Sequence, residues 1–386
     1  MTTIDADELR RRCTALVPAL AARAEEGESL RRVPDATLAE ARAAGLLEAV
    51  VPTSLGGHGL GLDALAQGTR ELAHGCPATA WTLSFLMLHG WLLSKLPADG
   101  RDEVFAAGPV VLAPAPLAPT GTITPADGGY RVTGRWEWAT GVAHADWVLV
   151  HAIQTEPAFS TRFLAVPRAE VEVDDVWFTS GMRATGSNTV RVEDGFVPTR
   201  RTIDARALLD ASDEIAGDGL AHHPVPSVLA LVAAAPALGA AEAAVDLFRQ
   251  RLSERVLAYS LGDRQREQPA AQVRLATAMS DLTSARVRWD AAIGDVVAAG
   301  ASGGATDQLR VATRLTAAAT VRASRHVIST VCEGAGASVY FASSPLQRLQ
   351  RDVEVLKGHV IFDWDRTAEL AGRFALGFGL RPTDLV

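Results

Sequence analysis

The chain has 386 residues, of which 48% are hydrophobic and 21% are charged. This length supports two or three packed units, and the composition is too apolar for a disordered protein. The formal net charge of -8 would repel a phosphate backbone, and no basic stripe with interleaved aromatic residues offsets it. We therefore predict a folded protein that does not bind nucleic acid.

The sequence shows no signal for a membrane or for a metal site. The N-terminal segment is acidic and lacks an apolar signal-peptide core, and no later run of about 18 uncharged apolar residues follows. We therefore expect a cytoplasmic protein that does not associate with a membrane. The cysteines Cys13, Cys76 and Cys332 do not form the close pairs of a zinc site or redox dithiol, and no histidine pair has metal-binding spacing. We predict no metal.

Hydrophobic patterning divides the chain into three parts. Residues 1–110 show apolar spacings of three and four, which predict a helical domain interrupted by a glycine-rich loop at residues 51–62. Residues 111–205 carry turn residues, then β-branched and aromatic runs with period-two alternation, which predict a β domain. Residues 206–386 return to helical spacing and predict a helical bundle. The expected fold class is α+β, mostly α.

Four helices are expected in the C-terminal part of the chain. Three are Ala-rich and should cover Pro236 to Leu252, Ala270 to Val297 and Asp307 to Ala335. The fourth should begin at Pro345 with Ser344 as its N-cap, because serine suits the cap and proline suits the first helical position. Its apolar stripe comprises Leu346, Leu349, Val353, Leu356 and Val360.

Several segments, in this order, resemble the acyl-CoA dehydrogenase superfamily. They are VPTSLGGHGL and AHGCPATAW in the N-terminal part, YRVTGRWEWATGVAHADW and GMRATGSNTVRVEDGFVP in the middle, and EGAGASVYFASSPLQRLQRDV in the C-terminal part. Because they span nearly the whole chain, the resemblance implies the acyl-CoA dehydrogenase-like fold of helical domain, β domain and helical bundle. GMRATGSN and RDVEVLKGH are most similar to the two-component flavin-dependent (group D) monooxygenases.

The resemblance implies a flavin site at two segments of the β domain. Trp138, Ala139 and Thr140 would bind the cofactor, with the Thr140 hydroxyl at the flavin N5 edge. The GMRATGSN turn would lie beside the flavin and the substrate entrance, with Arg183 and Ser187 as donors to an anionic ligand. From the residues alone, the favoured interpretation is that Trp138 is a core aromatic and Thr140 a turn residue, and the resemblance reverses this preference.

Two further segments are similar to those that bind the flavin tail. In RLSERVLAYSLGDRQREQPAAQ, Arg264 or Arg266 would reach the flavin phosphate of a neighbouring subunit, since a guanidinium fork fits phosphate oxygens. Gly334 and Gly336 would form the glycine-rich turn at the tail. The alternative for the arginines is a solvated helix end. A site shared across subunits, together with apolar helix faces, implies a homo-oligomer, with a tetramer expected.

One residue type separates the dehydrogenases of this superfamily from its oxygenases. A dehydrogenase needs a carboxylate base to remove a proton beside the thioester carbonyl. In most of the family this base is a Glu placed eight residues after the Asp of the final Arg-Asp pair, and counting from Asp352 reaches Val360. A branch of the family places the base on an earlier helix, and the corresponding residues 226–239 contain no acid. The dehydrogenase base is therefore missing.

A histidine precedes the position of the missing base. The similar oxygenases carry a histidine in this neighbourhood, where reduced FMN or FAD reacts with O2 to a C4a-hydroperoxide and an imidazole can donate a proton or hydrogen bond. We therefore predict His359 and Thr140 as catalytic residues. The alternative is a boundary histidine bonded to Asp363, one helical turn later.

His144, Trp81 and Cys76 are predicted to line the substrate pocket. The resemblance implies a two-component flavin-dependent monooxygenase that takes reduced flavin from a separate reductase. It would hydroxylate a small aromatic or polyketide-like molecule in secondary metabolism. Three alternatives stay open: an N-hydroxylase of an amine or amino sugar, an acyl-CoA dehydrogenase-like flavin desaturase with a relocated base, and a family member without catalytic activity.

Overall fold

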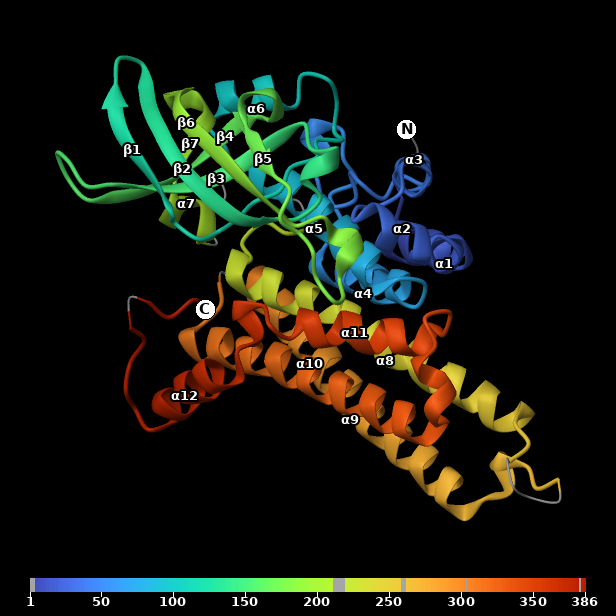
Figure 1. Ribbon diagram of the computed structural model, residues 1–386. Helices are drawn as coiled ribbons and strands as arrows, with labels where there is room; N and C mark the ends of the chain where they lie inside the picture. Colours follow the sequence, from blue (N-terminus) through green and yellow to red (C-terminus); the bar gives the residue numbers. More distant parts are fainter. Residues whose placement is uncertain (1–3, 211–218, 258–261, 303, 382) are drawn as a thin grey trace.

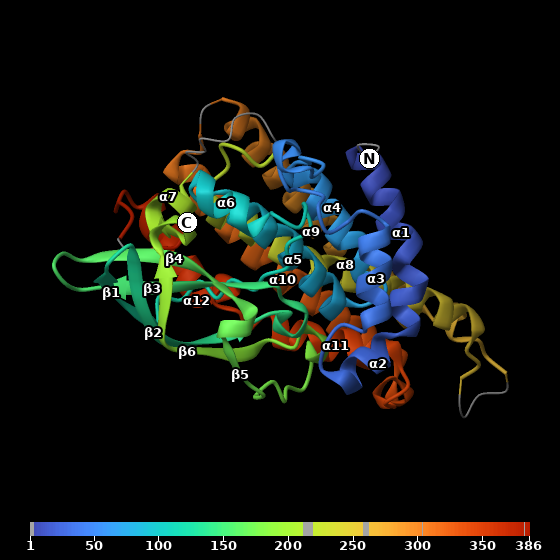
Figure 2. The same cartoon turned by 90° about the horizontal axis from the view of Figure 1, so that it is seen from above.

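The computed structural model describes residues 4–210, 219–257, 262–302, 304–381 and 383–386. It consists of an N-terminal helical layer, a β domain beside it and a bundle of long C-terminal helices (Figure 1). Seen from above, the β domain covers one end of the helical assembly (Figure 2). The predicted fold class and its order of helices, strands and helices are confirmed.

The N-terminal layer is built around one apolar helix. Its described elements are α1 (Ala6–Ala22), α2 (Ala24–Leu30), α3 (Asp35–Ala43), η1 (Thr53–Leu55), α4 (Leu62–Ala73), α5 (Pro77–Ser94) and α6 (Ala98–Val104). Helix α5 is buried over nearly its whole length, which is typical of a helix that is apolar on all sides. The glycine-rich segment 51–62 contains only the short η1 and turns before α4 begins, so the predicted loop is confirmed.

The β domain has a second hydrophobic core of its own. Its strands are β1 (Gly121–Ala126), β2 (Gly129–Ala139), β3 (Trp147–Gln154), β4 (Ser160–Pro167), β5 (Glu172–Asp174), β6 (Asn188–Pro198) and β7 (Thr202–Asp204). They form one sheet in the order β5-β6-β2-β1-β3-β4-β7, antiparallel except for β1 with β3. Ala139 at the end of β2 pairs with Asn188 at the start of β6, so the two neighbouring loops meet.

The C-terminal bundle contains the longest helices. Its described elements are α7 (Ala205–Leu209), α8 (Val225–Glu254), η6 (Gln265–Glu267), α9 (Pro269–Ala301), α10 (Asp307–Ala335), η7 (Ala337–Tyr340), α11 (Pro345–Leu356), η8 (Val360–Phe362) and α12 (Trp364–Ala375). The predicted helical segment Pro236 to Leu252 lies within α8, which begins earlier, at Val225, so that Pro236 is inside the helix. The residues around Pro236 are fully buried, and this packing compensates for the missing backbone N–H.

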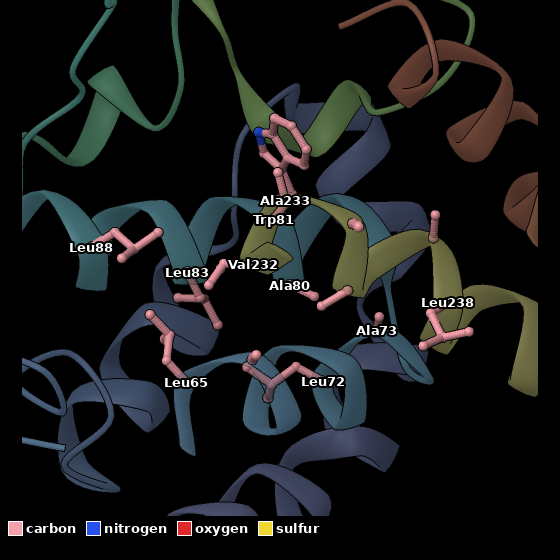
Figure 3. Close-up of a cluster of buried hydrophobic side chains, with 14 of the residues drawn as sticks. Leu65, Leu72, Ala73, Ala80, Trp81, Leu83, Leu88, Val232, Ala233 and Leu238 are labelled. Atoms are coloured by element: carbon pink, nitrogen blue, oxygen red, sulfur yellow. The ribbon is translucent and has the colours of Figure 1, made fainter. Parts of the chain in front are cut away.

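Helix α8 is long and apolar enough to cross a membrane, but 94% of its most apolar window is buried inside the protein. Figure 3 shows Val232, Ala233 and Leu238 of α8 packed into the same cluster as side chains of α4 and α5. The helix therefore serves as the core of the bundle. The apolarity that a membrane span requires is used here for contacts between helices.

The predicted start of α11 is confirmed, with Ser344 as N-cap and Pro345 in the first turn. Its end differs from the expectation that the helix continues to Val360. The helix ends at Leu356, Gly358 follows, and a new 3-10 turn starts after His359. His359 therefore lies in a loop between two helices, and its direction is set by that loop.

Candidate active site

The junction of β2 and β6 carries a chain of hydroxyl groups. Thr185 Oγ1 donates to the carbonyl of Met182 at 2.9 Å and lies 2.8 Å from Ser187 Oγ. Ser187 Oγ lies 2.9 Å from Thr140 Oγ1. The backbone N–H of Gly141 donates to the Thr185 carbonyl at 2.9 Å, which fixes the two loops against each other. Thr140 and Ser187, predicted from separate motifs, are thus direct neighbours.

Counting the protons of these groups shows what Thr140 can do. Each hydroxyl has one proton, and the proton of Thr185 is used on the Met182 carbonyl. The contact between Ser187 and Thr185 therefore uses the proton of Ser187, and Thr140 in turn donates to Ser187. Thr140 Oγ1 also accepts from Trp81 Nε1, which leaves it one lone pair. The Thr140 hydroxyl can therefore accept a hydrogen bond from a group that binds beside it.

Two aromatic residues of α5 form a wall next to Thr140. The indole Nε1 of Trp81 donates to Thr140 Oγ1 at 3.4 Å. The Trp81 ring lies 4.6 Å from that of Phe85 and, edge to face, 5.4 Å from the imidazole of His359. Figure 3 shows Trp81 projecting from α5 on the side away from Leu65 and Leu72 of α4. The wall thus connects Thr140 of the β domain with His359 of the bundle.

His359 is held as a neutral imidazole with one free donor. The residue is open to solvent on one side. Desolvation by the surrounding protein, and then the positive charge of Arg314, lower the pKa of His359 to about 4. Its Nδ1 accepts from the N–H of Ile361 at 3.3 Å, so the neutral ring carries its proton on Nε2. The alternative bond to Asp363 is not formed, because that carboxylate caps α12 by accepting from the N–H of Arg366 at 3.1 Å.

The loop that follows β5 is anchored by Asp352 of α11. Asp352 Oδ1 accepts from the backbone N–H of Met182 at 2.6 Å, and Met182 adopts the left-handed conformation with φ 52°. A Cβ on Gly181 would lie 2.2 Å from the carbonyl oxygen of Arg351, so only glycine allows this approach. Burial raises the pKa of Asp352 to about 7. The sequence argument used Asp352 only as a landmark and missed this role, although the adjacent Arg-Asp pair was a signal.

Two side chains beside the hydroxyl chain are available for a ligand. The Nε of Arg183 is buried without a hydrogen-bond partner in the described part of the chain. Trp138, at the end of β2, has φ 62° and an exposed fraction of 61%. An unpartnered guanidinium nitrogen, an exposed indole and a hydroxyl with a remaining lone pair fit a flat, polar-edged ring such as flavin. Ala139, between Trp138 and Thr140, is buried and contributes backbone only.

Two residues predicted for the substrate pocket face elsewhere. His144 Nε2 lies 2.8 Å from the carbonyl oxygen of Val33, and its Nδ1 lies 3.7 Å from a carboxylate oxygen of Asp35. Its ring therefore contacts the N-terminal helices. Cys76 is buried at the N-cap of α5, and burial, followed by the charge of Asp352, raises the pKa of its thiol. In the described part of the chain, no hydrogen bond or ring contact joins either side chain to Trp81 or His359.

The residues expected at the flavin tail form a separate cluster. Arg264 and Arg266 are exposed on the segment that joins α8 and α9, of which residues 258–261 lie outside the described part of the chain. Between them, Gln265 donates to the carbonyl of Gly334 at 2.9 Å. Gly336 ends α10 with φ 78°. In Figure 1 this end of α8 and α9 points away from the β domain.

Sequence reasoning missed one residue of this second cluster. Arg255, directly after α8, donates to the carbonyl of Ala335 at 2.6 Å and therefore fixes the glycine-rich turn. A Cβ on Gly336 would lie 3.1 Å from an Arg255 guanidinium nitrogen, which adds to the need for glycine. The cluster lies beyond the N-terminal end of α11, whereas His359 lies beyond its C-terminal end. The 12 residues of α11 separate them by roughly 18 Å.

The position of a dehydrogenase base holds no carboxylate. Val360 has an exposed fraction of 51% and begins η8 next to His359. Residues 226–239 lie inside α8 and are almost entirely buried and without acids. Proton removal from an acyl thioester has no base at either place.

Comparison with known proteins gives the family. The chain matches the family "Acyl-CoA dehydrogenase, N-terminal domain" over residues 5–103 and "Acyl-CoA dehydrogenase, C-terminal domain" over residues 231–364. It is 34% identical to a pigment production hydroxylase of a Rhodococcus species, over 96% of this chain and 96% of that one. The chain belongs to the acyl-CoA dehydrogenase family.

Within the acyl-CoA dehydrogenase family, the chain is similar to oxygenases. It is 32% identical to the flavin-dependent monooxygenase oxygenase subunit HsaA of Mycobacterium tuberculosis, covering 100% of this chain and 99% of that one. It is 29% identical to the oxygenase component of an FADH2-dependent resorcinol hydroxylase from a Rhizobium species, over 92% and 90%. The solved structure of XiaF from Streptomyces, in complex with FADH2 and glycerol, matches with a TM-score of 0.92 at 28% identity, over 98% and 97%.

Proposed function

We propose that this chain is the oxygenase component of a two-component flavin-dependent monooxygenase and that it hydroxylates a small aromatic molecule. One observation carries the proposal: the cluster of Thr140, Trp81 and His359 adjoins Val360, where a dehydrogenase would have its base. The site offers hydrogen-bond donors and aromatic walls without a carboxylate base. The similarity to oxygenase components over the whole chain supports the same activity.

Reduced flavin, when bound, reacts with O2 and supplies the oxygen atom for insertion. Thr140 would suit the N5 edge of reduced flavin, because N5 then carries a hydrogen and the remaining lone pair of this hydroxyl can accept it. Arg183 and Ser187 would hold the polar edge of the ring, and Trp138 would pack against it. One similar protein is FADH2-dependent by name and another was solved with FADH2 bound, which favours FAD over FMN as the cofactor of this chain.

His359 would act at the oxygen end of the reaction. The neutral ring presents Nε2–H toward the site, since Nδ1 is occupied by the N–H of Ile361. A neutral donor can stabilise a developing oxyanion and deliver a proton without bringing a full charge into the site. The low pKa of about 4 keeps the ring in this form at neutral pH.

An aromatic carbon is the favoured site of hydroxylation. Trp81 and Phe362 flank the His359 imidazole, with ring centroids at 5.4 and 5.9 Å from it, and Phe85 packs against Trp81 at 4.6 Å. Such walls suit a flat apolar substrate. Among the similar proteins, one acts by name on resorcinol, which favours carbon over the nitrogen of an amine or amino sugar.

The working enzyme would be an assembly with a partner reductase. Arg264 and Arg266 are exposed at the end of the bundle away from Thr140, so they would serve the flavin of a neighbouring subunit. Helix α9 also exposes Val273, Met279 and Val287. We propose a homotetramer in the cytoplasm that receives reduced flavin from a separate flavin reductase.

The test mixes the anaerobic protein with FADH2 and a panel of phenols, then adds 18O2. One 18O atom in a hydroxylated product is expected. In a second arm, an acyl-CoA series is added anaerobically to the protein with oxidised FAD, and dithionite serves as the positive control for reduction. The flavin should keep its colour with every acyl-CoA. Bleaching by an acyl-CoA would overturn the proposal in favour of the desaturase, and flavin binding without product from any phenol would favour a non-catalytic or different role.

A further inference from the structure

Arg314 of α10 is a buried arginine that binds three separate parts of the chain. Its exposed fraction is 8%. Its guanidinium donates to the carbonyl of Val360 at 3.1 Å, to the Thr367 hydroxyl of α12 at 3.5 Å, and to the carbonyl of Leu385 near the C-terminus. All three acceptors are neutral oxygens. In the part of the chain that the structure describes, no carboxylate pairs with it, which is a costly arrangement for a buried cation.

The bond to Val360 links Arg314 to the active site. Val360 follows His359 directly, and the short turn η8 also provides the Ile361 N–H that selects the His359 tautomer. Fixing the Val360 carbonyl therefore fixes the backbone from which the imidazole projects. The three-way fork holds this loop to α12 and to the C-terminal segment.

The C-terminal tail that Arg314 contacts is itself anchored. Arg373 of α12 donates to Asp384 at 2.7 Å and to the carbonyl of Gly379 at 2.8 Å. The backbone N–H of Arg381 donates to the same carboxylate at 2.7 Å. The Leu385 carbonyl is thereby brought to Arg314 as a fixed acceptor.

Nearby carboxylates offset the positive charge of Arg314 only in part. Desolvation, and then the like charge of Arg366, lower the pKa of Arg314, while Asp363 and Asp384 raise it. Asp363 is used as the cap of α12 and Asp384 is paired with Arg373. Among the described residues, Arg314 is the charged group that, after desolvation, lowers the pKa of His359.

We infer that Arg314 is a positioning residue for His359: its fork to Val360, Thr367 and Leu385 sets the direction of Nε2–H, and its buried positive charge opposes a second positive charge on that ring. The role of the histidine in oxygen transfer rests on the proposed function. The effect of Arg314 on the orientation and protonation of His359 does not depend on the proposed function. Arg314 need not touch flavin or substrate for this role.

Two substitutions separate the fork from the charge. Arg314→Gln removes both, whereas Arg314→Lys keeps the charge and loses the planar fork. Arg322→Gln is the matched control, because Arg322 also lies on α10 and packs its guanidinium 4.4 Å from the Trp364 ring of α12 but makes no bond to the His359 loop. The pKa of His359 is measured by NMR in the flavin-free full-length protein with labelled histidine, and its signal is assigned with His359→Gln.

The expected result is an upward shift of the His359 pKa in Arg314→Gln and none in Arg314→Lys or Arg322→Gln. The yield of hydroxylated product per reduced flavin consumed should fall about tenfold in both Arg314 variants, with flavin affinity within about threefold of wild type. An unchanged pKa in a folded Arg314→Gln variant, or a wild-type yield in Arg314→Lys, would overturn the inference. If Arg314→Gln does not fold, the yield of Arg314→Lys decides. Absence of product from the wild type would instead count against the proposed function, and the NMR comparison would still apply.

Discussion

The indole N–H of Trp81 donates to the hydroxyl of Thr140 at 3.4 Å, so a side chain of the N-terminal helical layer and a strand end of the β domain meet at one point. The same indole contacts the His359 imidazole edge to face. Trp81 thus joins three parts of the chain that are distant in sequence, and the role of each part can be tested by substituting one residue of a contact.

Trp81 should act mainly through its ring. Trp81→Phe keeps an aromatic wall and loses one long hydrogen bond, so we expect product yield within about threefold of wild type. Trp81→Ala removes the buried ring, which should cost about 3–5 kcal/mol in the free energy of unfolding and raise the KM for the aromatic substrate. Urea unfolding and steady-state kinetics check both effects. Equal yields and KM values for the two variants would show that the ring does not line the substrate pocket.

Thr140 should contribute a hydrogen bond to reduced flavin. Thr140→Val keeps the shape and removes the hydroxyl, and we expect the Kd for FADH2 to rise about three- to tenfold, the effect of one hydrogen bond. Thr140→Ser should restore most of the affinity. Thr82→Val is the control, because that hydroxyl is buried nearby but donates to the Ala78 carbonyl within α5. Anaerobic titration measures Kd. Equal affinities for Thr140→Val and wild type would remove the hydroxyl from flavin binding.

Asp352 should make part of the stability depend on pH. Its pKa is raised to about 7 in the folded state, so the folded protein binds a proton that the unfolded chain releases near pH 4. Its contribution to folding is therefore most favourable below about pH 4 and is lost as pH rises through 7, at up to roughly 1 kcal/mol per pH unit. Relative to Asp352→Asn, the wild type should lose free energy of unfolding between pH 5 and pH 8. The free energies of unfolding of both proteins are measured with urea at the two pH values. An equal change between pH 5 and pH 8 in wild type and Asp352→Asn would contradict this prediction.

Arg264 and Arg266 should contribute to flavin binding in the oligomer but should not be needed for the oligomer to form. Both are exposed, so the double variant with alanine at both positions should fold and keep its oligomeric state in light scattering. Its Kd for FADH2 should rise about tenfold or more, because a charged hydrogen bond to phosphate is lost. Arg288→Ala, an exposed substitution on α9, is the control. A wild-type protein that is monomeric at 40.7 kDa and still binds FADH2 would contradict both the assembly and the shared site.

Local patterns predicted the fold, and contacts between distant segments decided much of the site. Helical and strand periodicities are local, so the order of elements and the start of α11 at Pro345 followed from the sequence. The sequence did not indicate how far α8 extends before Pro236, because packing around this helix outweighs the local cost of a proline. The role of Asp352 depends on a bond to Met182, and that of Arg314 on a bond to Val360, and neither contact leaves a local pattern. His144 was plausible by position, but the Val33 carbonyl binds its ring.

Substitution of His359 should impair oxygen transfer and leave flavin binding nearly unchanged. His359→Ala removes the Nε2–H donor, while the groups proposed for flavin, Thr140 and Arg183, stay in place, so the Kd for FADH2 should remain within about threefold of wild type. Loss of one positioned donor should reduce hydroxylated product per reduced flavin roughly ten- to a thousandfold, with hydrogen peroxide rising in compensation.

The pH profile gives an independent check on His359. Because its pKa is lowered to about 4, the ring stays neutral from pH 6 to 8, and the product yield should show no step from its titration in that range. Both product and peroxide are measured against FADH2 consumed, so a general loss of stability is recognised by a fall in both. If the histidine served only the local turn with Ile361, the alanine variant would lose about 1 kcal/mol of stability and keep its coupling. A wild-type ratio of product to peroxide in His359→Ala would therefore exclude the imidazole from oxygen transfer.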